Sequence, residues 1–214
     1  MLERSVRCFE QQTYPQRELI IVYDTDDTDT AAWVSPMAAT RGIRGIQAGI
    51  GGTQTLGELR NLSISSARGE FIAQWDDDDW HAPERLERQL AGLLNHPRAC
   101  GCVLTRWLIH DGVTGLTYVS ARRPWEGSLV ARRATLPPYP LLSRGEDTQV
   151  ISAILRSGTL VSIDHPTLYI YCYHGNNTWD RAHFERNVVA HAHPLYGSAA
   201  NWVIDRVIQP IQPL

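Results

Sequence analysis

The chain has 214 residues, a formal net charge of -3 and a pI of about 6.2, so it carries no overall basic footprint for nucleic acid. It contains no lysine, which excludes a lysine Schiff base and a Walker-type phosphate-binding lysine. No apolar run reaches the roughly 18 residues of a membrane span. The four cysteines have no paired spacing, which favours reduced thiols and a cytoplasmic location. The 43% of hydrophobic residues can build a sizeable core, and we expect a single domain over residues 1–214.

The first half of the chain alternates helix and strand patterns. In order, the predicted elements are a helix over 2–12, a strand over 18–23, a short helix capped by Thr28 or Asp29 and running through Trp33, a weak strand over 43–47, a helix over 54–68 ended by Gly69, a strand over 71–75, and a helix opened by Pro83. The strand over 18–23 is continuously apolar, which is typical of burial on both faces of a parallel sheet. Residues 1–95 are therefore predicted to form a parallel α/β half.

The second half, over residues 96–214, has a mixed pattern. The predicted elements are a hairpin of 100–109 and 116–119 around Asp111-Gly112, a short strand over 128–130, a helix after a Ser143-to-Glu146 capping box, strands over 160–163 and 167–173, and a last helix over 180–192. The residues from Pro194 onward give only weak signals. No repeat and no linker divides the chain.

Four consecutive aspartates, residues 76–79, follow the apolar strand at 71–75 and stand between Trp75 and Trp80. The carboxyl ends of strands in open α/β sheets are where ligands bind. Clustered carboxylates suit a hard cation such as Mg²⁺ or Mn²⁺. From the run alone, the alternative is a surface turn with a helix-capping aspartate.

Several phrases, taken together and in order, resemble the family 2 glycosyltransferases of GT-A fold. They are Gln12-Thr13-Tyr14-Pro15, residues 18–24, Leu56-Gly57-Glu58-Leu59-Arg60-Asn61, residues 67–73, the Asp76–Asp79 run, residues 85–90, and Gly145-Glu146-Asp147-Thr148. The resemblance implies a Rossmann-like, mostly parallel sheet flanked by helices. It also implies metal-dependent, inverting transfer of a sugar, usually from a UDP-sugar, to an acceptor hydroxyl such as that of a saccharide. The cofactor would be Mn²⁺ or Mg²⁺.

The resemblance also assigns roles on the donor side. Asp76 matches the first acid of the family's DxD motif, beside the ribose, and Asp78 matches the last, which binds metal; Asp77 occupies the variable position between them. Asp24 matches an acid that contacts the nucleotide base or ribose. Arg60 matches an arginine near the nucleotide, although a helix-surface arginine is an equal alternative. Asp79 matches a flanking acidic position of less certain role.

The remaining roles belong to the second half. Asp147 matches the family's catalytic base, which takes the acceptor's proton, while the spacing of Glu146 from Ser143 fits helix capping. His174 would complete the metal site as in some GT-A enzymes, with a structural histidine as the alternative. Arginines 122, 123, 132, 133 and 144 would line the diphosphate or an anionic acceptor, or else be solvated surface. Trp107 and Trp125 would stack on a sugar or pack in the core.

One departure from the family concerns the start of the sequence. The family's usual central first strand is absent, and we expect the chain as given to be less stable than one extended upstream by a strand. This departure leaves a second interpretation open, a non-catalytic nucleotide- or sugar-binding remnant. A third, a phosphotransferase with an aspartate nucleophile, usually needs a lysine partner, which the chain does not have.

Overall fold

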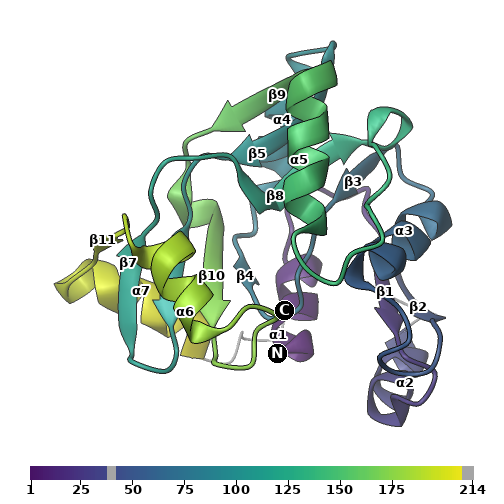
Figure 1. Cartoon of the computed structure of the whole chain (residues 1–214), viewed down its shortest axis with the longest axis horizontal. Coiled ribbons are helices and arrows are strands. Elements are labelled where there is room, and N and C mark those ends of the chain that lie inside the picture. The colour runs from purple at the N-terminus through teal and green to yellow at the C-terminus, as the bar shows by residue number, and fades with distance from the viewer. Residues whose placement is uncertain (38–41, 209–214) are drawn as a thin grey trace.

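The computed structural model describes residues 1–37 and 42–208 (Figure 1). The helices are α1 (Leu2–Glu10), α2 (Thr28–Val34), α3 (Leu56–Ser66), α4 (Arg85–Leu94), α5 (Glu146–Ser157), α6 (Arg181–His183) and α7 (Gly197–Ile208), with 3-10 turns at Ser35–Met37, Arg133–Thr135 and Pro166–Leu168 and a π-helix at Phe184–Val189. The strands are β1 (Leu19–Tyr23), β2 (Ile43–Gln47), β3 (Phe71–Ala73), β4 (Trp80–His81), β5 (Ala99–Leu104), β6 (Leu108–Asp111), β7 (Leu116–Val119), β8 (Trp125–Arg132), β9 (Thr159–Ile163), β10 (Tyr169–Tyr173) and β11 (His193–Pro194). None of the described helices has the length and apolar character of a membrane span.

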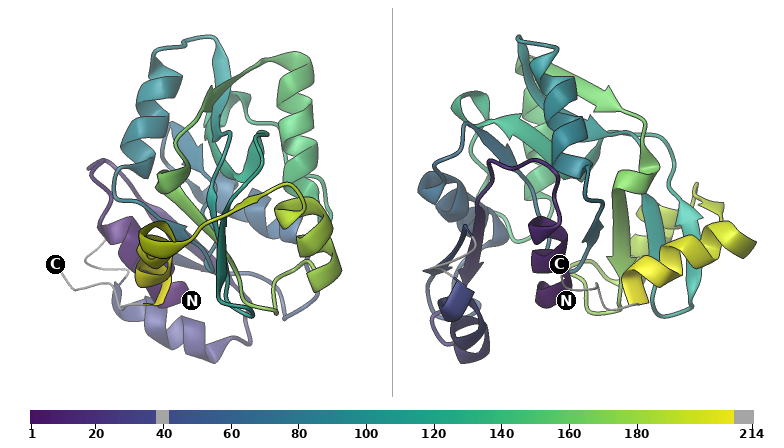
Figure 2. Two further views of the ribbon diagram at one scale, coloured as in Figure 1. Left: turned by 90° about the vertical axis from the view of Figure 1, so that its left-hand side faces the viewer. Right: turned by 180° about the vertical axis from the view of Figure 1, so that it is seen from behind.

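A four-stranded sheet in the order β3-β8-β5-β9 carries α4 and α5 on opposite faces (Figure 2). Successive residues of a strand point to opposite faces. Cys102 of β5 accordingly packs with Leu93 of α4, while its neighbour Val103 packs with Val150 and Ile154 of α5. This sheet fixes the start of α5, where Glu146 and Asp147 lie.

A second sheet has the order β11-β7-β6-β10-β4 and holds the largest core cluster. The predicted strand over 100–109 is wrong as one element, because residues 105–107 carry the chain from β5 in the first sheet to β6 in the second. Only β6 forms the predicted hairpin with β7. Trp107 and Trp125 stack with ring centroids 4.3 Å apart inside this core, and both are buried.

The parallel pair β1 and β2 stands apart from both larger sheets. Among the described strands, β1 has only β2 as a neighbour, and β3 is the last strand of its own sheet. A cavity of about 520 Å³ lies between them, lined by Leu19 and Ile20 of β1 and by Ile72 and Ala73 of β3. No described segment provides a strand between these two edges.

The structure corrects several of the predicted element boundaries. The first helix ends at Glu10, and Asp27 caps α2 by accepting from the Thr30 N–H at 3.0 Å. Thr55 and Glu58 form a capping box at the start of α3, which ends at Ser66. Further corrections are the longer β8, the shorter β3, the π-helix that follows α6, and α7 in the region with weak signals.

Candidate functional site

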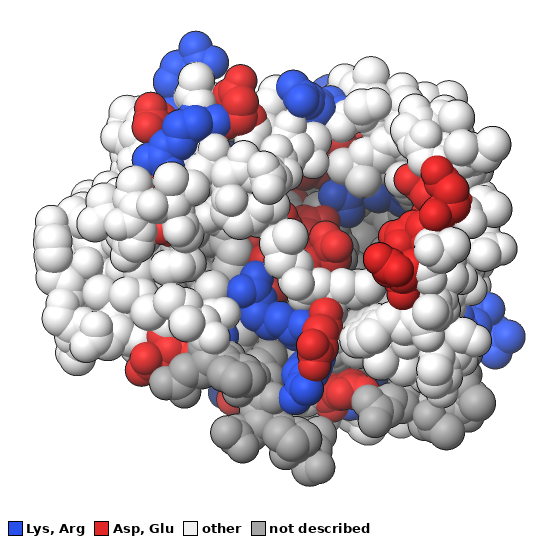
Figure 3. All heavy atoms as spheres, turned by 90° about the horizontal axis from the view of Figure 1, so that it is seen from below, with Lys and Arg blue, Asp and Glu red and all other residues white. Residues whose placement is uncertain are grey.

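Four aspartates follow β3, and the fold gives them different surroundings. The loop backbone is fastened by α1, where the Ser5 hydroxyl donates to the Asp76 carbonyl at 3.3 Å and Arg4 donates to the Asp78 carbonyl. Asp77 is exposed, and Asp79 is buried. Figure 3 shows acidic and basic side chains around a hollow on the face seen from below.

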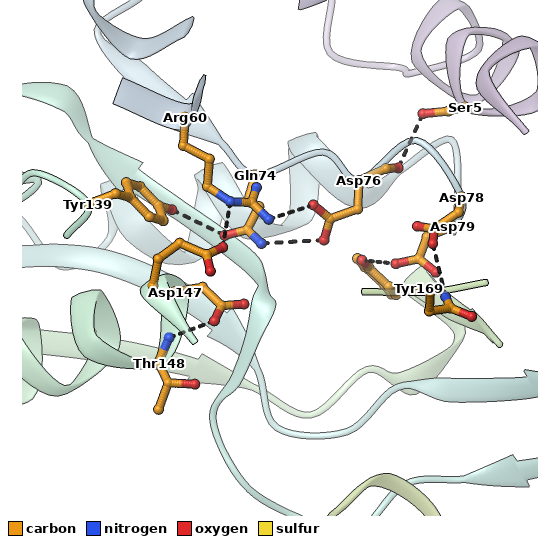
Figure 4. Close-up of polar contacts among 12 residues, drawn as sticks. Ser5, Arg60, Gln74, Asp76, Asp78, Asp79, Tyr139, Asp147, Thr148 and Tyr169 are labelled. Atoms are coloured by element: carbon orange, nitrogen blue, oxygen red, sulfur yellow. Dashed lines mark hydrogen bonds and ion pairs between the residues drawn. The ribbon is translucent and has the colours of Figure 1, made fainter. Parts of the chain in front are cut away.

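Arg60 of α3 joins the acidic run to the start of α5. Its Nη2 lies 3.0 Å from Asp76 Oδ1, and its Nε lies 2.9 Å from Glu146 Oε1 (Figure 4). Burial opposes the positive charge, but the carboxylates, Asp76 first, raise the pKa of Arg60 overall. Arg60 Nη1 has no hydrogen-bond partner among the described residues. Arg60 therefore lies against the acidic run, whereas its predicted contact with a nucleotide stays a prediction.

The capping role predicted for Glu146 is wrong. Gly145, in the left-handed conformation with φ of 72°, is the residue before α5 and makes no side-chain cap. The Glu146 side chain is buried against Arg60 instead. Burial raises the pKa of its carboxyl, and the charge of Arg60 opposes that rise.

Asp147, the next residue, is partly exposed at the first turn of α5. Its Oδ1 accepts from the Thr148 N–H at 2.7 Å, and its Oδ2 has no partner among the described residues. Figure 4 shows Asp147 with its contact to Thr148, and both Asp147 and Asp76 act electrostatically on Arg60. The catalytic role predicted for Asp147 stays a prediction, and the geometry leaves one carboxylate oxygen free for it.

Asp78 meets the loop that follows β10. His174 Nε2 lies 3.2 Å from Asp78 Oδ2, and the Asn177 amide donates to the same oxygen at 3.0 Å. Burial raises the pKa of Asp78 to about 6, and the negative charges of Asp76 and Asp77 add to this rise. The structure thus brings together Asp78 and His174, the two residues predicted as metal ligands.

The fit of a hard cation to this pair depends on the donor set. One carboxylate and one imidazole are suitable ligands for Mn²⁺, and Mg²⁺ is commonly held by one or two carboxylates with substrate phosphates. Within residues 1–37 and 42–208, no three His, Cys, Asp or Glu side chains form a metal-binding group. The described residues would therefore supply only part of the coordination shell of such a cation.

Asp79 is buried, unlike the exposed Asp77 of the same run. The Tyr169 hydroxyl and the Cys172 N–H both donate to its carboxylate, the latter at 2.7 Å. Burial raises the pKa of Asp79 well above its ordinary value, and Asp78 adds to the rise. Asp79 therefore connects the acidic run to β10.

Asp24 lies at the end of β1, beside a glycine-rich loop. A Cβ added to Gly51 would come within 3.2 Å of its carboxylate, and Asp26 accepts from the Gly51 N–H at 2.8 Å. No hydrogen bond among the described residues joins Asp24 to Asp76 or Asp78. Its predicted contact with a nucleotide base or ribose stays a prediction.

Sequence reasoning missed three polar residues of this site. Gln74 donates to Asp76 at 3.3 Å and accepts from the Tyr139 hydroxyl at 3.1 Å. Glu126, which is buried, accepts from the Thr148 hydroxyl at 3.4 Å, and burial raises its pKa. No local spacing marked these residues, because the hydrogen bonds of Gln74 with Tyr139 and of Glu126 with Thr148 join distant segments.

The fold and the acidic strand end define a protein of the GT-A glycosyltransferase class. The model of the family described as Glycosyl transferase family 2 matches residues 1–131, which is more than half of the chain, so the chain belongs to this family.

Solved structures with the same fold include S. aureus TarS. The TarS 1-349 structure in complex with UDP has a TM-score of 0.64 and 17% identity, covering 80% of this chain and 56% of that one. The same TarS segment in complex with UDP-GlcNAc has a TM-score of 0.60 and 15% identity, covering 81% and 55%. The chain thus spans about half the length of these structures.

The relative named "Putative glycosyltransferase EpsH", from Bacillus subtilis (strain 168), is 54% identical over 37 residues, which is 17% of this chain and 11% of EpsH.

Proposed function

We propose that this chain transfers a sugar from a nucleotide sugar, a UDP-sugar by family resemblance, to an acceptor hydroxyl with inversion. Family membership and the TarS structures with UDP and UDP-GlcNAc support the donor class. The observation that carries the proposal is the bridge by Arg60, which joins Asp76 to Glu146, the residue before Asp147. In this proposal residues 1–95 bind the donor and residues 96–214 bind the acceptor.

The donor would lie along the acidic loop. Asp24 and Asp76 would contact the nucleoside, with Asp77 as an exposed carboxylate beside it. Arg60 would direct its free Nη1 to the donor while its other nitrogens stay paired. Asp78 and His174 would hold Mn²⁺ or Mg²⁺, which would neutralise the charge that develops on the departing diphosphate.

Asp147 would act on the acceptor. As the acceptor oxygen bonds to the anomeric carbon, the bond from that carbon to the diphosphate oxygen breaks, and the acceptor's proton passes to Asp147. The free Oδ2 is available for this proton. Glu126 is less suited to this role because it is buried and already accepts hydrogen bonds from Arg123 and Thr148.

The compartment is also part of the proposal. All four cysteines are free thiols. Unpaired cysteines are usual where thiols are kept reduced, so we propose a cytoplasmic location.

A second candidate function is nucleotide or sugar binding without catalysis. The cavity between β1 and β3 favours it, because a sheet interrupted there positions Asp24 less firmly. Binding of donor without any transfer to acceptor or to water would support this candidate.

Calorimetry of UDP binding tests the donor and metal parts together. We expect the affinity of the parent chain to be higher in Mn²⁺ than in EDTA, and Asp78→Asn to lose most of that difference. Asp205→Asn, at an exposed position of α7, is the control with the same change of charge. Equal affinities in Mn²⁺ and EDTA would contradict the metal role, and absence of UDP binding in both would contradict the function.

A further inference from the structure

A group of basic and aromatic side chains stands at the start of α5, on the acceptor half of the site. The Trp179 ring, in the loop after β10, stacks on His183 with ring centroids 4.0 Å apart and an interplanar angle of 11°. The Arg144 guanidinium lies 5.4 Å from the Trp179 ring centroid. Trp179 nevertheless keeps 37% of its surface exposed. The stack therefore holds Arg144 at the surface, three residues before Asp147.

Arg186 stands three residues after His183, in the π-helix that continues α6, and Arg123 also acts on this histidine through its charge. Burial lowers the pKa of His183, and the positive charges of Arg186, Arg123 and Arg144 lower it further against the opposing charge of Asp180. We name Arg123, Arg144, Arg186, Trp179 and His183 the acceptor-side cluster. All three arginines in it are exposed.

The charges of this cluster are only partly compensated. Arg123 pairs with Glu126 at 3.2 Å, and the Asp180 carboxylate accepts from the His183 N–H as the cap of α6. Arg144 and Arg186 form no ion pair with any described residue. By contrast, Arg60 has two carboxylate partners, and Arg106 and Arg122 share Asp164. The cluster thus offers two guanidinium groups that are still free to bind an anion.

The cluster is also linked to the proposed base. Arg123 contacts Glu126, and Glu126 accepts from the hydroxyl of Thr148, the residue after Asp147. Arg144 is separated from α5 only by Gly145. A molecule whose hydroxyl reaches Asp147 would therefore have its neighbouring groups within the range of these arginines.

We propose that the acceptor-side cluster binds an anionic group, a phosphate or a carboxylate, carried by the acceptor next to its reacting hydroxyl. The identification of the ligand as the acceptor rests on the proposed function, but the anion site itself does not. Guanidinium groups present paired N–H donors that match the oxygens of either anion, and such charge-assisted hydrogen bonds are stronger than neutral ones. Uncompensated arginines also attract anions before contact.

Binding of inorganic phosphate, followed by NMR at constant ionic strength, tests the anion site directly. We expect saturable shifts of the Trp179 indole and His183 imidazole signals that chloride does not produce. We also expect the pKa of His183 to rise with phosphate bound, because the anion offsets the arginine charges. The double variant Arg144→Gln/Arg186→Gln should lose both effects. Arg156→Gln, an exposed arginine in the last turn of α5, should keep them.

Transfer assays then separate the two anions. The acceptors are glycerol phosphate, glucuronic acid and uncharged glucose, with a donor that the parent chain binds. We expect the double variant to raise the KM for the anionic acceptor that the parent uses by about tenfold, the scale of one charge-assisted hydrogen bond. UDP affinity and use of glucose should not change. A rise in KM for glycerol phosphate would identify the bound anion as a phosphate, and a rise for glucuronic acid would identify it as a carboxylate.

The outcomes distinguish this inference from the proposed function. Phosphate shifts no larger than those of chloride, or shifts unchanged in the double variant, would overturn the anion site even if sugar transfer occurs. Failure of the parent to bind UDP would contradict the proposed function, while the phosphate titration would still decide whether the cluster binds anions.

Discussion

The first and third aspartates of the acidic run are two residues apart but lie in different electrostatic surroundings. Asp76 is paired with Arg60, which is paired again with Glu146. The Asp78 carboxylate has the imidazole of His174 and the amide of Asn177 as neighbours but pairs with no arginine among the described residues, and burial among like charges raises its pKa to about 6. The Asp76 side is compensated by the protein alone, whereas the Asp78 side gains most from an added cation. This contrast agrees with the proposed division between a preformed scaffold and a metal-assisted diphosphate site.

The largest expected effect comes from breaking the compensated side. Arg60→Met would leave Glu146 buried without its cation, and loss of one partner of a buried pair costs about 3–5 kcal/mol. The free energy of unfolding from urea titration measures this loss. Arg68→Met, just after the same helix and exposed, should stay within about 0.5 kcal/mol of the parent. A small effect of Arg60→Met, equal to that of Arg68→Met, would remove the distinction between the two aspartates.

A second prediction concerns the end of the run. Asp79→Ala would leave the Tyr169 hydroxyl and the Cys172 N–H without their buried acceptor, at a cost of about 1–3 kcal/mol. Thermal and urea unfolding should both show the loss. Asp77→Ala is the matched control, and its exposed side chain predicts almost no change. Equal stabilities of the two variants would mean that Asp79 does not fasten the loop to β10.

The smallest expected effect concerns a second aspartate that pairs with an arginine, outside the acidic run. Asp111 is paired with Arg181 at 2.7 Å. Burial opposes its charge, but hydrogen bonds from Thr114 and Arg181 lower its pKa overall. A lowered folded-state pKa gives stability that is complete above the unfolded value near 3.9 and is lost as the pH falls through the folded value.

Asp111→Asn should therefore be less stable than the parent at pH 7, by about 1 kcal/mol, and the difference should shrink toward pH 3. Urea unfolding at several pH values provides the comparison. Asp205→Asn, at an exposed position of α7, serves as the control. A difference that grows as the pH falls would reverse the sign and contradict the pairing.

The sequence predicted most elements of the first half because each has a local signal. The apolar run over 18–23 and the aspartates after residue 75 mark strand ends without reference to distant residues. The same reasoning could not separate β5 from β6, because one long apolar run does not distinguish a single strand from two consecutive buried strands. Helix α7 was missed because the residues after Pro194 carry only a weak local pattern.

Within the site, the family resemblance assigned roles to Asp76, Asp78 and Asp147, which stay predictions, whereas the capping spacing misread Glu146. A capping box and a buried ion pair both put an acid at a helix start, and only the fold reveals Arg60, 86 residues away, as the partner. Gln74 and Tyr139 were missed because their hydrogen bond also spans distant segments. Residues whose role depends on a long-range partner are therefore the ones that sequence patterns predict least well.

The most direct test of the account compares Asp147→Asn with Asp78→Asn, measuring transfer rate and donor affinity against the parent chain. Asp147→Asn should keep the fold and donor affinity but lose about 10²–10⁴-fold in transfer rate, because an amide cannot accept the acceptor's proton. Asp78→Asn should weaken metal-dependent donor binding as well as turnover. If Asp147→Asn transfers sugar at the parent's rate, Asp147 is only a residue of the helix start and the base lies elsewhere.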